Sequence, residues 1–222
     1  MDNKNKVMFE KFDSANRNDA ICVIDYGMGN LRSIEKKLMQ VGAEVYISSD
    51  SVEILNAKKL ILPGVGNFAK GVKNLKVLGI WDVLNAKVIE EKTPVLGICL
   101  GMQLMAKHSQ EGDVKGLNWI DANVVKFQIK DTLTFKVPHI GWNSINVKRK
   151  SSLLSGLPKD ASFYFVHSYH IICNNDNDVI CTTEYEYEFT SAVQKNNIYG
   201  TQFHPEKSHD LGETIFRNFI SL

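Results

Sequence analysis

The sequence lacks several features that mark common classes of protein. No apolar run approaches the roughly 18 residues of a membrane-spanning helix. The 26 Lys and Arg form no stripe and balance 25 Asp and Glu to a net charge of +1, which argues against nucleic acid as a partner. The first residues lead into no long apolar segment, so we expect no signal peptide.

Cysteine is scarce as well. The chain of 222 residues has 4 cysteines, and none are spaced as C-x-x-C, so we expect no metal site. Three of them, Cys22, Cys173 and Cys181, are expected to be reduced residues within strands. A reducing compartment, the cytoplasm, fits this usage.

The length suggests one α/β domain with a sizeable core. Residues 1–19 are polar and rich in Asn and Lys, and we interpret them as a flexible N-terminal extension. Residues 20–222 then form the domain.

Strands and helices alternate through the first half of the domain, which favours a doubly wound parallel sheet. In such a sheet ligands bind beyond the carboxyl ends of the strands. After Gly112 strands follow one another without room for crossover helices, so we expect a more antiparallel half. The expected strands are 21–25, 43–47, 59–62, 95–98, 122–130, 143–148, 162–168, 179–183, 192–195 and 198–203. The expected helices are 31–41, 52–56, 69–92 and 210–221, with a helical turn at 153–158.

A candidate nucleophile lies where one of these strands meets a helix. Cys99 follows the apolar run 95–98 and precedes a stretch of strong helix formers, with Gly97 and Gly101 two residues away on either side. This is the thiol version of the G-x-S-x-G nucleophile turn, in which neighbouring side chains would collide with the strained nucleophile. The N–H of Leu100, free at the start of the helix, can help hold an oxyanion. A small buried core cysteine is the simpler alternative.

A second stretch supplies partners for a nucleophilic cysteine. The aromatic strand 198–203 delivers His204, then Pro205, then Glu206. His204 can accept the thiol proton, and Glu206 can orient the imidazole. His139 is a weaker candidate base, because no carboxylate lies beside it in the sequence.

Together these segments resemble the class I (triad) glutamine amidotransferases, and within them the glutaminase subunits of imidazole glycerol phosphate synthase. The resemblance rests on residues 97–103 and 203–206, with three further segments at 25–31, 62–68 and 138–143 and a fourth at 165–169. It runs from about residue 21 to the C-terminus. It implies an open, mostly parallel, flavodoxin-like sheet with helices on both faces.

The resemblance also implies roles for loop residues. The Gly-rich loop after strand 59–62 would complete the oxyanion hole with an N–H near Gly64 and Val65, in some members only after a peptide flip on activation. Gly64 and Gly66 would let the backbone approach the substrate. Gln103 and the backbone of His167, Ser168 and Tyr169 would hold the α-amino and α-carboxylate groups of glutamine.

A partner protein is the remaining implication. Asn30, His139, Trp142 and Lys207 would face a (β/α)₈ cyclase subunit that uses the ammonia and forms a heterodimer with this chain. Trp142 would be an exposed anchor.

Two structural interpretations are rejected. Segment 138–143 is interrupted by Pro138 and Gly141, so we do not expect it to be a core strand. Turn 27–29 lacks the third glycine of a dinucleotide site, which excludes that interpretation.

The expected activity is hydrolysis of glutamine to glutamate and ammonia through a cysteine thioester, without a metal or organic cofactor. Three alternatives stay open. They are a paralogous amidotransferase that feeds another acceptor such as a surface amino sugar, a cysteine hydrolase of peptidase or chaperone type, and a non-catalytic binding subunit.

Overall fold

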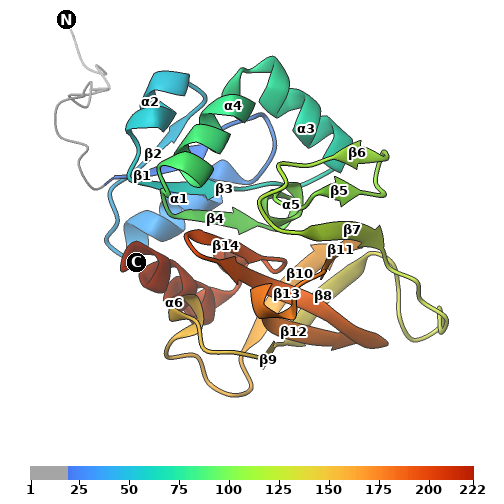
Figure 1. Ribbon diagram of the computed structural model, residues 1–222. Helices are drawn as coiled ribbons and strands as arrows, with labels where there is room; N and C mark the ends of the chain where they lie inside the picture. Colours follow the sequence, from blue (N-terminus) through green and yellow to red (C-terminus); the bar gives the residue numbers. More distant parts are fainter. Residues whose placement is uncertain (1–19) are drawn as a thin grey trace, which may run out of the picture.

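The computed structural model describes residues 20–222, so the expected extension at 1–19 lies outside the described residues. A large twisted sheet forms the centre of the molecule (Figure 1). The strands are β1 Ile21–Ile24, β2 Val45–Ser48, β3 Lys59–Leu62, β4 Val95–Ile98, β5 His108–Ser109, β6 Val114–Lys115, β7 Ala122–Lys126, β8 His139–Ser144, β9 Asn146–Val147, β10 Ser162–His167, β11 Tyr169–Cys173, β12 Val179–Tyr185, β13 Tyr187–Lys195 and β14 Ile198–Thr201. The helices are α1 Leu31–Gln40, α2 Ser51–Asn56, α3 Phe68–Val77, α4 Ile80–Asn85, the π-helical η2 Ala86–Glu90, α5 Leu100–Leu104 and α6 His209–Ile220, with 3₁₀ turns η3 Ser152–Leu154, η4 Asp176–Asp178 and η5 Pro205–Lys207.

The main sheet changes character along its width. Its strand order is β2-β1-β3-β4-β14-β13-β11-β7-β5-β6, and β12 and β9 continue from β13. The pairings from β2 to β14 are all parallel, whereas β14, β13, β11 and β7 pair in antiparallel fashion. β8 and β10 form a separate antiparallel pair. This confirms the expected open sheet with a parallel N-terminal half and a more antiparallel C-terminal half.

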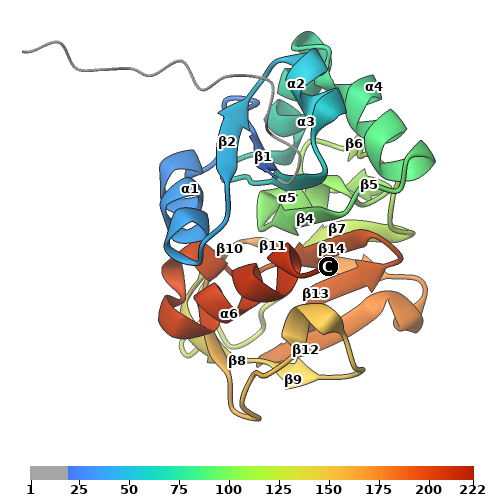
Figure 2. The same ribbon diagram turned by 90° about the vertical axis from the view of Figure 1, so that its left-hand side faces the viewer.

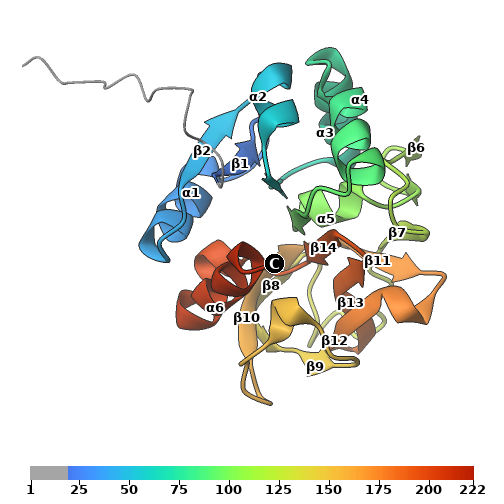
Figure 3. The ribbon, with the colours of Figure 1, turned by 60° about the vertical axis from the view of Figure 1, so that its left-hand side comes forward.

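Helices cover both faces of the parallel half (Figure 3). On β1, the side chains of Cys22 and Ile24 pack with α2, α3, α4 and α5, whereas Ile21 and Val23 pack with α1 and α6. Figure 2 shows α1 and α6 side by side, and Lys37 of α1 forms an ion pair of 2.9 Å with Glu213 of α6. Alternate residues of a continuous apolar strand therefore belong to two different cores, as expected for a strand buried on both faces.

Three expected elements differ from the structure. The helix expected at 69–92 is broken at Gly79, whose φ of +69° is left-handed, into α3, α4 and the π-helical turn. Residues 139–144 form strand β8 although the segment contains a glycine and follows a proline, because β10 pairs with all six residues. Strand β11 at Tyr169–Cys173 has no counterpart among the expected strands.

No helix among residues 20–222 is long and apolar enough to cross a membrane.

Strands β3, β4 and β14 are adjacent and parallel, and this arrangement positions the candidate site. The segments that follow them, at 63–66, 99 and 202–206, therefore meet at one edge of the sheet.

Candidate active site

Cys99 occupies the sharp turn between β4 and α5. Its φ and ψ are 53° and −110°, a conformation that L-residues rarely adopt. The backbone N–H of Cys99 donates to the carbonyl of Thr201 at 2.7 Å, which ties the turn to the end of β14. A strained backbone held in this way presents the side chain at a fixed place, as a nucleophile requires.

The glycines around the turn are required by backbone neighbours. A Cβ on Gly97 would lie 2.7 Å from the backbone nitrogen of Met102, and one on Gly101 would overlap the carbonyl of Leu62 on β3. The sequence suggests crowding by the cysteine as the reason for both glycines. The structure instead shows that they let α5 pack directly against two strands.

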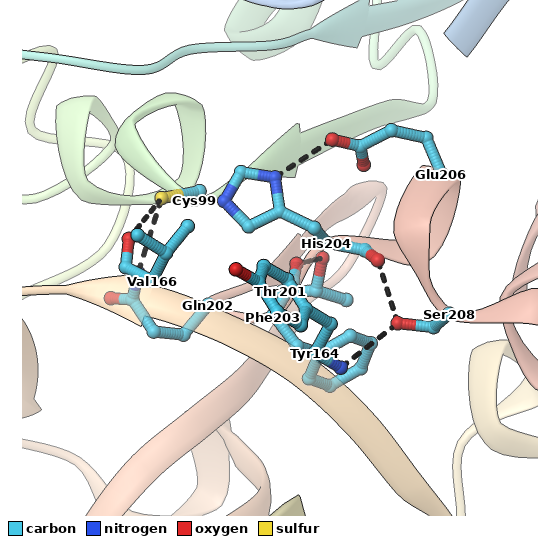
Figure 4. A network of polar contacts seen from close by, with 9 residues as sticks. All are labelled: Cys99, Tyr164, Val166, Thr201, Gln202, Phe203, His204, Glu206 and Ser208. Atoms are coloured by element: carbon cyan, nitrogen blue, oxygen red, sulfur yellow. Dashed lines mark hydrogen bonds and ion pairs between the residues drawn. The ribbon is translucent and has the colours of Figure 1, made fainter. Parts of the chain in front are cut away.

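His204 and Glu206 form a hydrogen-bonded pair beside Cys99. Nδ1 of His204 lies 2.7 Å from Oε1 of Glu206, and both side chains are 1% exposed. The other ring nitrogen, Nε2, faces the sulfur of Cys99 (Figure 4). Nε2 is one of the few buried side-chain polar atoms in the described residues without a hydrogen-bond partner. It is therefore available to exchange a proton with the thiol.

The electrostatics of the pair favour a charged imidazole. Burial by itself lowers the pKa of His204, but its interactions with Cys99 and Glu206 outweigh it and raise the pKa to about 10. A thiolate next to an imidazolium is the arrangement of an activated cysteine nucleophile.

The Leu100 N–H, expected from the sequence to be free, is occupied. It donates to the carbonyl of Gly64 at 3.3 Å. The Gly64–Val65 peptide thus turns its carbonyl, and not its N–H, toward the site. Since an oxyanion needs donors, the expected hole of Leu100, Val65 and Gly64 is not assembled in this structure.

A cavity of about 350 Å³ opens beside the cysteine. Its volume is within the range of small-molecule sites. Eight of the residues proposed from the sequence line it: Val65, Gly66, Cys99, Leu100, Gln103, His167, Ser168 and Tyr169. His204, Glu206 and Gly64 are buried and are not among the lining residues.

Three further lining residues were not proposed as site residues: Glu111, and Pro138 and Val166, which lie within the segments 138–143 and 165–169. Glu111 contributes the only carboxylate among the lining residues of this cavity, and its Oε2 accepts a hydrogen bond of 2.7 Å from the N–H of Phe68 at the start of α3. A lone Glu in a loop carries no pattern, so only the fold reveals its position. Among residues 20–222 no group of three or more His, Cys, Asp or Glu could hold a metal ion.

The residues proposed to face a partner differ in exposure. Asn30 and Lys207 are exposed, and Trp142 is 50% exposed with its ring stacked on His209 at 5.1 Å. His139 is only 3% exposed, because its ring is stacked between Phe165 and Tyr185. The side chain of His139 therefore offers almost no surface to a partner, and that part of the expectation is corrected.

His139 belongs instead to a buried histidine pair. Its Nδ1 lies 3.2 Å from Nε2 of His167, whose Nδ1 donates to the carbonyl of Tyr169 at 2.8 Å. Burial lowers the pKa of His139 to about 4 and that of His167 well below its ordinary value. Both rings are neutral near pH 7, so neither supplies a cationic acid to the cavity.

Comparisons with known proteins agree with this geometry. The model of the family described as "Glutamine amidotransferase class-I" matches residues 22–222. The chain is 52% identical over 200 residues to the imidazole glycerol phosphate synthase subunit HisH 2 of Methanococcus maripaludis, covering 90% of this chain and 98% of the relative. It is 44% identical to the subunit HisH 2 of Pseudomonas aeruginosa, covering 91% and 99%. Among solved structures, a putative GMP synthase subunit from Thermoplasma acidophilum is similar with a TM-score of 0.69 at 26% identity, covering 91% of this chain and 92% of that chain.

Proposed function

Because the chain belongs to the class I glutamine amidotransferase family, we propose that it is the glutaminase subunit of an imidazole glycerol phosphate synthase. In this role it hydrolyses glutamine and delivers the ammonia to a cyclase subunit. The observation that carries the proposal is the buried His204–Glu206 pair. The unpartnered Nε2 of its imidazole faces the strained Cys99, which lines a cavity.

In the proposed reaction the Cys99 thiolate attacks the side-chain amide carbon of glutamine. His204 first accepts the thiol proton and then donates a proton to the departing ammonia, while Glu206 holds the imidazole in the required tautomer. Water assisted by His204 then hydrolyses the γ-glutamyl thioester and releases glutamate. Apart from glutamine and that water, this sequence of steps uses only groups of this protein.

The oxyanion of the tetrahedral intermediate requires a change in the Gly64–Val65 peptide. A flip of this peptide would withdraw the Gly64 carbonyl and turn the Val65 N–H toward the site. The same movement would release the Leu100 N–H from its present acceptor. After the flip, the N–H groups of Val65 and Leu100 would both be free to donate to the oxyanion. Each such donor lowers the barrier by about 3 kcal/mol.

The cavity supplies complementary groups for an amino acid. Glu111 places a carboxylate where an α-ammonium group could pair with it, and Gln103, Ser168 and Tyr169 supply backbone and amide groups for the rest of the glutamine head. The side-chain amide then extends toward Cys99.

A partner follows from the chemistry of the product. Ammonia released into water is protonated and loses its nucleophilicity, so the site should open only toward a synthase docked over it. We propose a (β/α)₈ cyclase that converts a ribotide into imidazole glycerol phosphate and an aminoimidazole carboxamide ribotide, a step of histidine biosynthesis. Asn30, Trp142 and Lys207 are the proposed contact residues, and the cytoplasm is the proposed compartment, where the thiol of Cys99 stays reduced.

The acceptor can be tested genetically. A histidine auxotroph that lacks its own glutaminase subunit should grow without histidine when it carries this chain together with the matching cyclase, and the Cys99→Ala variant should not restore growth. If the wild-type chain hydrolyses glutamine in vitro but never restores growth with its cyclase, the acceptor is another one, such as an amino sugar.

A further inference from the structure

Gln202 is a buried amide that directly contacts the proposed nucleophile. It lies between the end of β14 and His204, and its side chain is fully buried. Its Nε2 donates to the sulfur of Cys99 at 3.5 Å, and the close-up view shows the amide beside the sulfur (Figure 4). The contact uses a donor other than His204.

The orientation of the Gln202 amide is fixed by a chain of hydrogen bonds that starts at a backbone carbonyl. The carbonyl of Tyr169 can only accept, so Gln103 must present its Nε2 to it, at 2.9 Å. The second hydrogen of the same Nε2 goes to Oε1 of Gln202, also at 2.9 Å. Gln202 must therefore direct its own NH₂ group toward Cys99.

The sulfur needs such a donor once it is charged. The carbonyl oxygen of Val166 lies 4.0 Å from Sγ, where a thiol can donate to it weakly but a thiolate would be repelled. An N–H from Gln202 offsets this repulsion, because hydrogen bonds to charged groups are stronger than those between neutral groups. It also supports the sulfur while His204 passes its proton to the leaving group.

We propose that Gln202 is a positioning residue that holds the Cys99 sulfur for attack and links its position to the wall of the glutamine cavity. The link exists because Gln103 and Tyr169 both line the cavity and both belong to the chain that orients Gln202. The inference rests on the proposed glutaminase function for its catalytic consequence. The contact itself does not depend on that function.

Two variants and one matched control test the proposal. Gln202→Met keeps the length of the side chain and removes the donor, and Gln202→Asn keeps an amide but withdraws it by one methylene. Gln194→Met makes the same chemical change on β13, where the amide donates a hydrogen bond to the hydroxyl of Tyr199 at 3.4 Å. Each protein is assayed in complex with its cyclase for the kcat and KM of glutamine hydrolysis. The rate at which iodoacetamide labels Cys99 is followed by mass spectrometry, and thermal unfolding is recorded.

We expect Gln202→Met to lower kcat by about tenfold to a hundredfold with little change in KM, since the loss of a hydrogen bond to a charged group affects the attacking atom. Labelling of Cys99 should slow in the same variant. Gln202→Asn should show both effects as well, and it takes the place of the Met variant in the test if that variant does not fold. Gln194→Met should match the wild type in both assays.

Unchanged kcat and labelling in the Gln202 variants would overturn the proposal. So would a rise in KM alone, or losses that the Gln194→Met control shares. If the wild-type complex hydrolyses no glutamine, the proposed function fails, but slower labelling in Gln202→Met would still establish the contact with Cys99.

Discussion

The N–H of Leu100 donates a hydrogen bond of 3.3 Å to the carbonyl of Gly64, which occupies one donor of the expected oxyanion hole. While this hydrogen bond is formed, the Leu100 N–H is not free to donate to an oxyanion. From this relationship we predict that the isolated protein has a low glutaminase rate, and that the proposed cyclase partner with its ribotide raises kcat at least a hundredfold. The reason is that one oxyanion donor is worth about 10²–10³ in kcat.

The measurement is the rate of glutamate formation by the isolated protein, by the complex, and by the complex with ribotide. Full activity of the isolated protein would contradict the interpretation that the Gly64–Val65 peptide must move.

The raised pKa of His204 predicts how stability depends on pH. The pKa lies near 6.5 in the unfolded chain and about 10 in the folded protein, so the folded state binds the proton more tightly. This contribution to stability is fully present below about pH 6.5 and is lost as the pH rises toward 10. Urea unfolding at several pH values should therefore show a steeper loss of stability for the wild type than for His204→Gln. Parallel curves for the two proteins would refute the ion pair.

The packing of α5 against β3 predicts a severe effect of one added methyl group. A Cβ on Gly101 would overlap the Leu62 carbonyl, which belongs to the sheet backbone and cannot move independently. We expect Gly101→Ala to lower the free energy of unfolding by about 3 kcal/mol or more. Gly79→Ala is the control, since it has open space and only the cost of a left-handed φ, about 1–2 kcal/mol. Equal losses in denaturant unfolding would show that α5 does not pack as described.

Trp142 should matter for binding more than for folding. Its ring is half exposed and stacked on His209, so truncation removes contact area from the surface and little from the core. We expect Trp142→Ala to weaken cyclase binding at least about thirtyfold with a melting temperature near that of the wild type. Val77→Ala, which truncates an exposed residue on α3, should leave binding unchanged in calorimetry. Unaltered affinity of the Trp142 variant would show that the interface with the cyclase does not include this residue.

Much of this architecture could be predicted from the sequence because the signals are local. The apolar run before Cys99 and its flanking glycines indicate a strand, a turn and a helix, and the run before His204 indicates a strand that ends at a base. The carboxyl ends of parallel strands lie at one edge of a sheet, so the sequence pattern could predict that the ends of β4 and β14 lie close together. The helix break at Gly79 was missed because an isolated glycine is compatible with either a continuous or a divided helix.

Other features depend on contacts that no local pattern contains. The orientation of the Gly64–Val65 peptide is set by Leu100, and a peptide can turn either way in a Gly-rich loop. Glu111 and Gln202 reach the site only through the fold, and the burial of His139 depends on Phe165 and Tyr185 from two other strands. Local sequence patterns identify the reactive groups here better than they identify the residues that hold them.

The most direct test of the account compares two nitrogen sources in the complex of this chain with its cyclase. Cys99→Ala should abolish product formation with glutamine and leave product formation with ammonium salts at the wild-type rate, because the thiol acts only in releasing ammonia. Turnover of glutamine by the Cys99→Ala complex would contradict the central claim that this sulfur cleaves the amide.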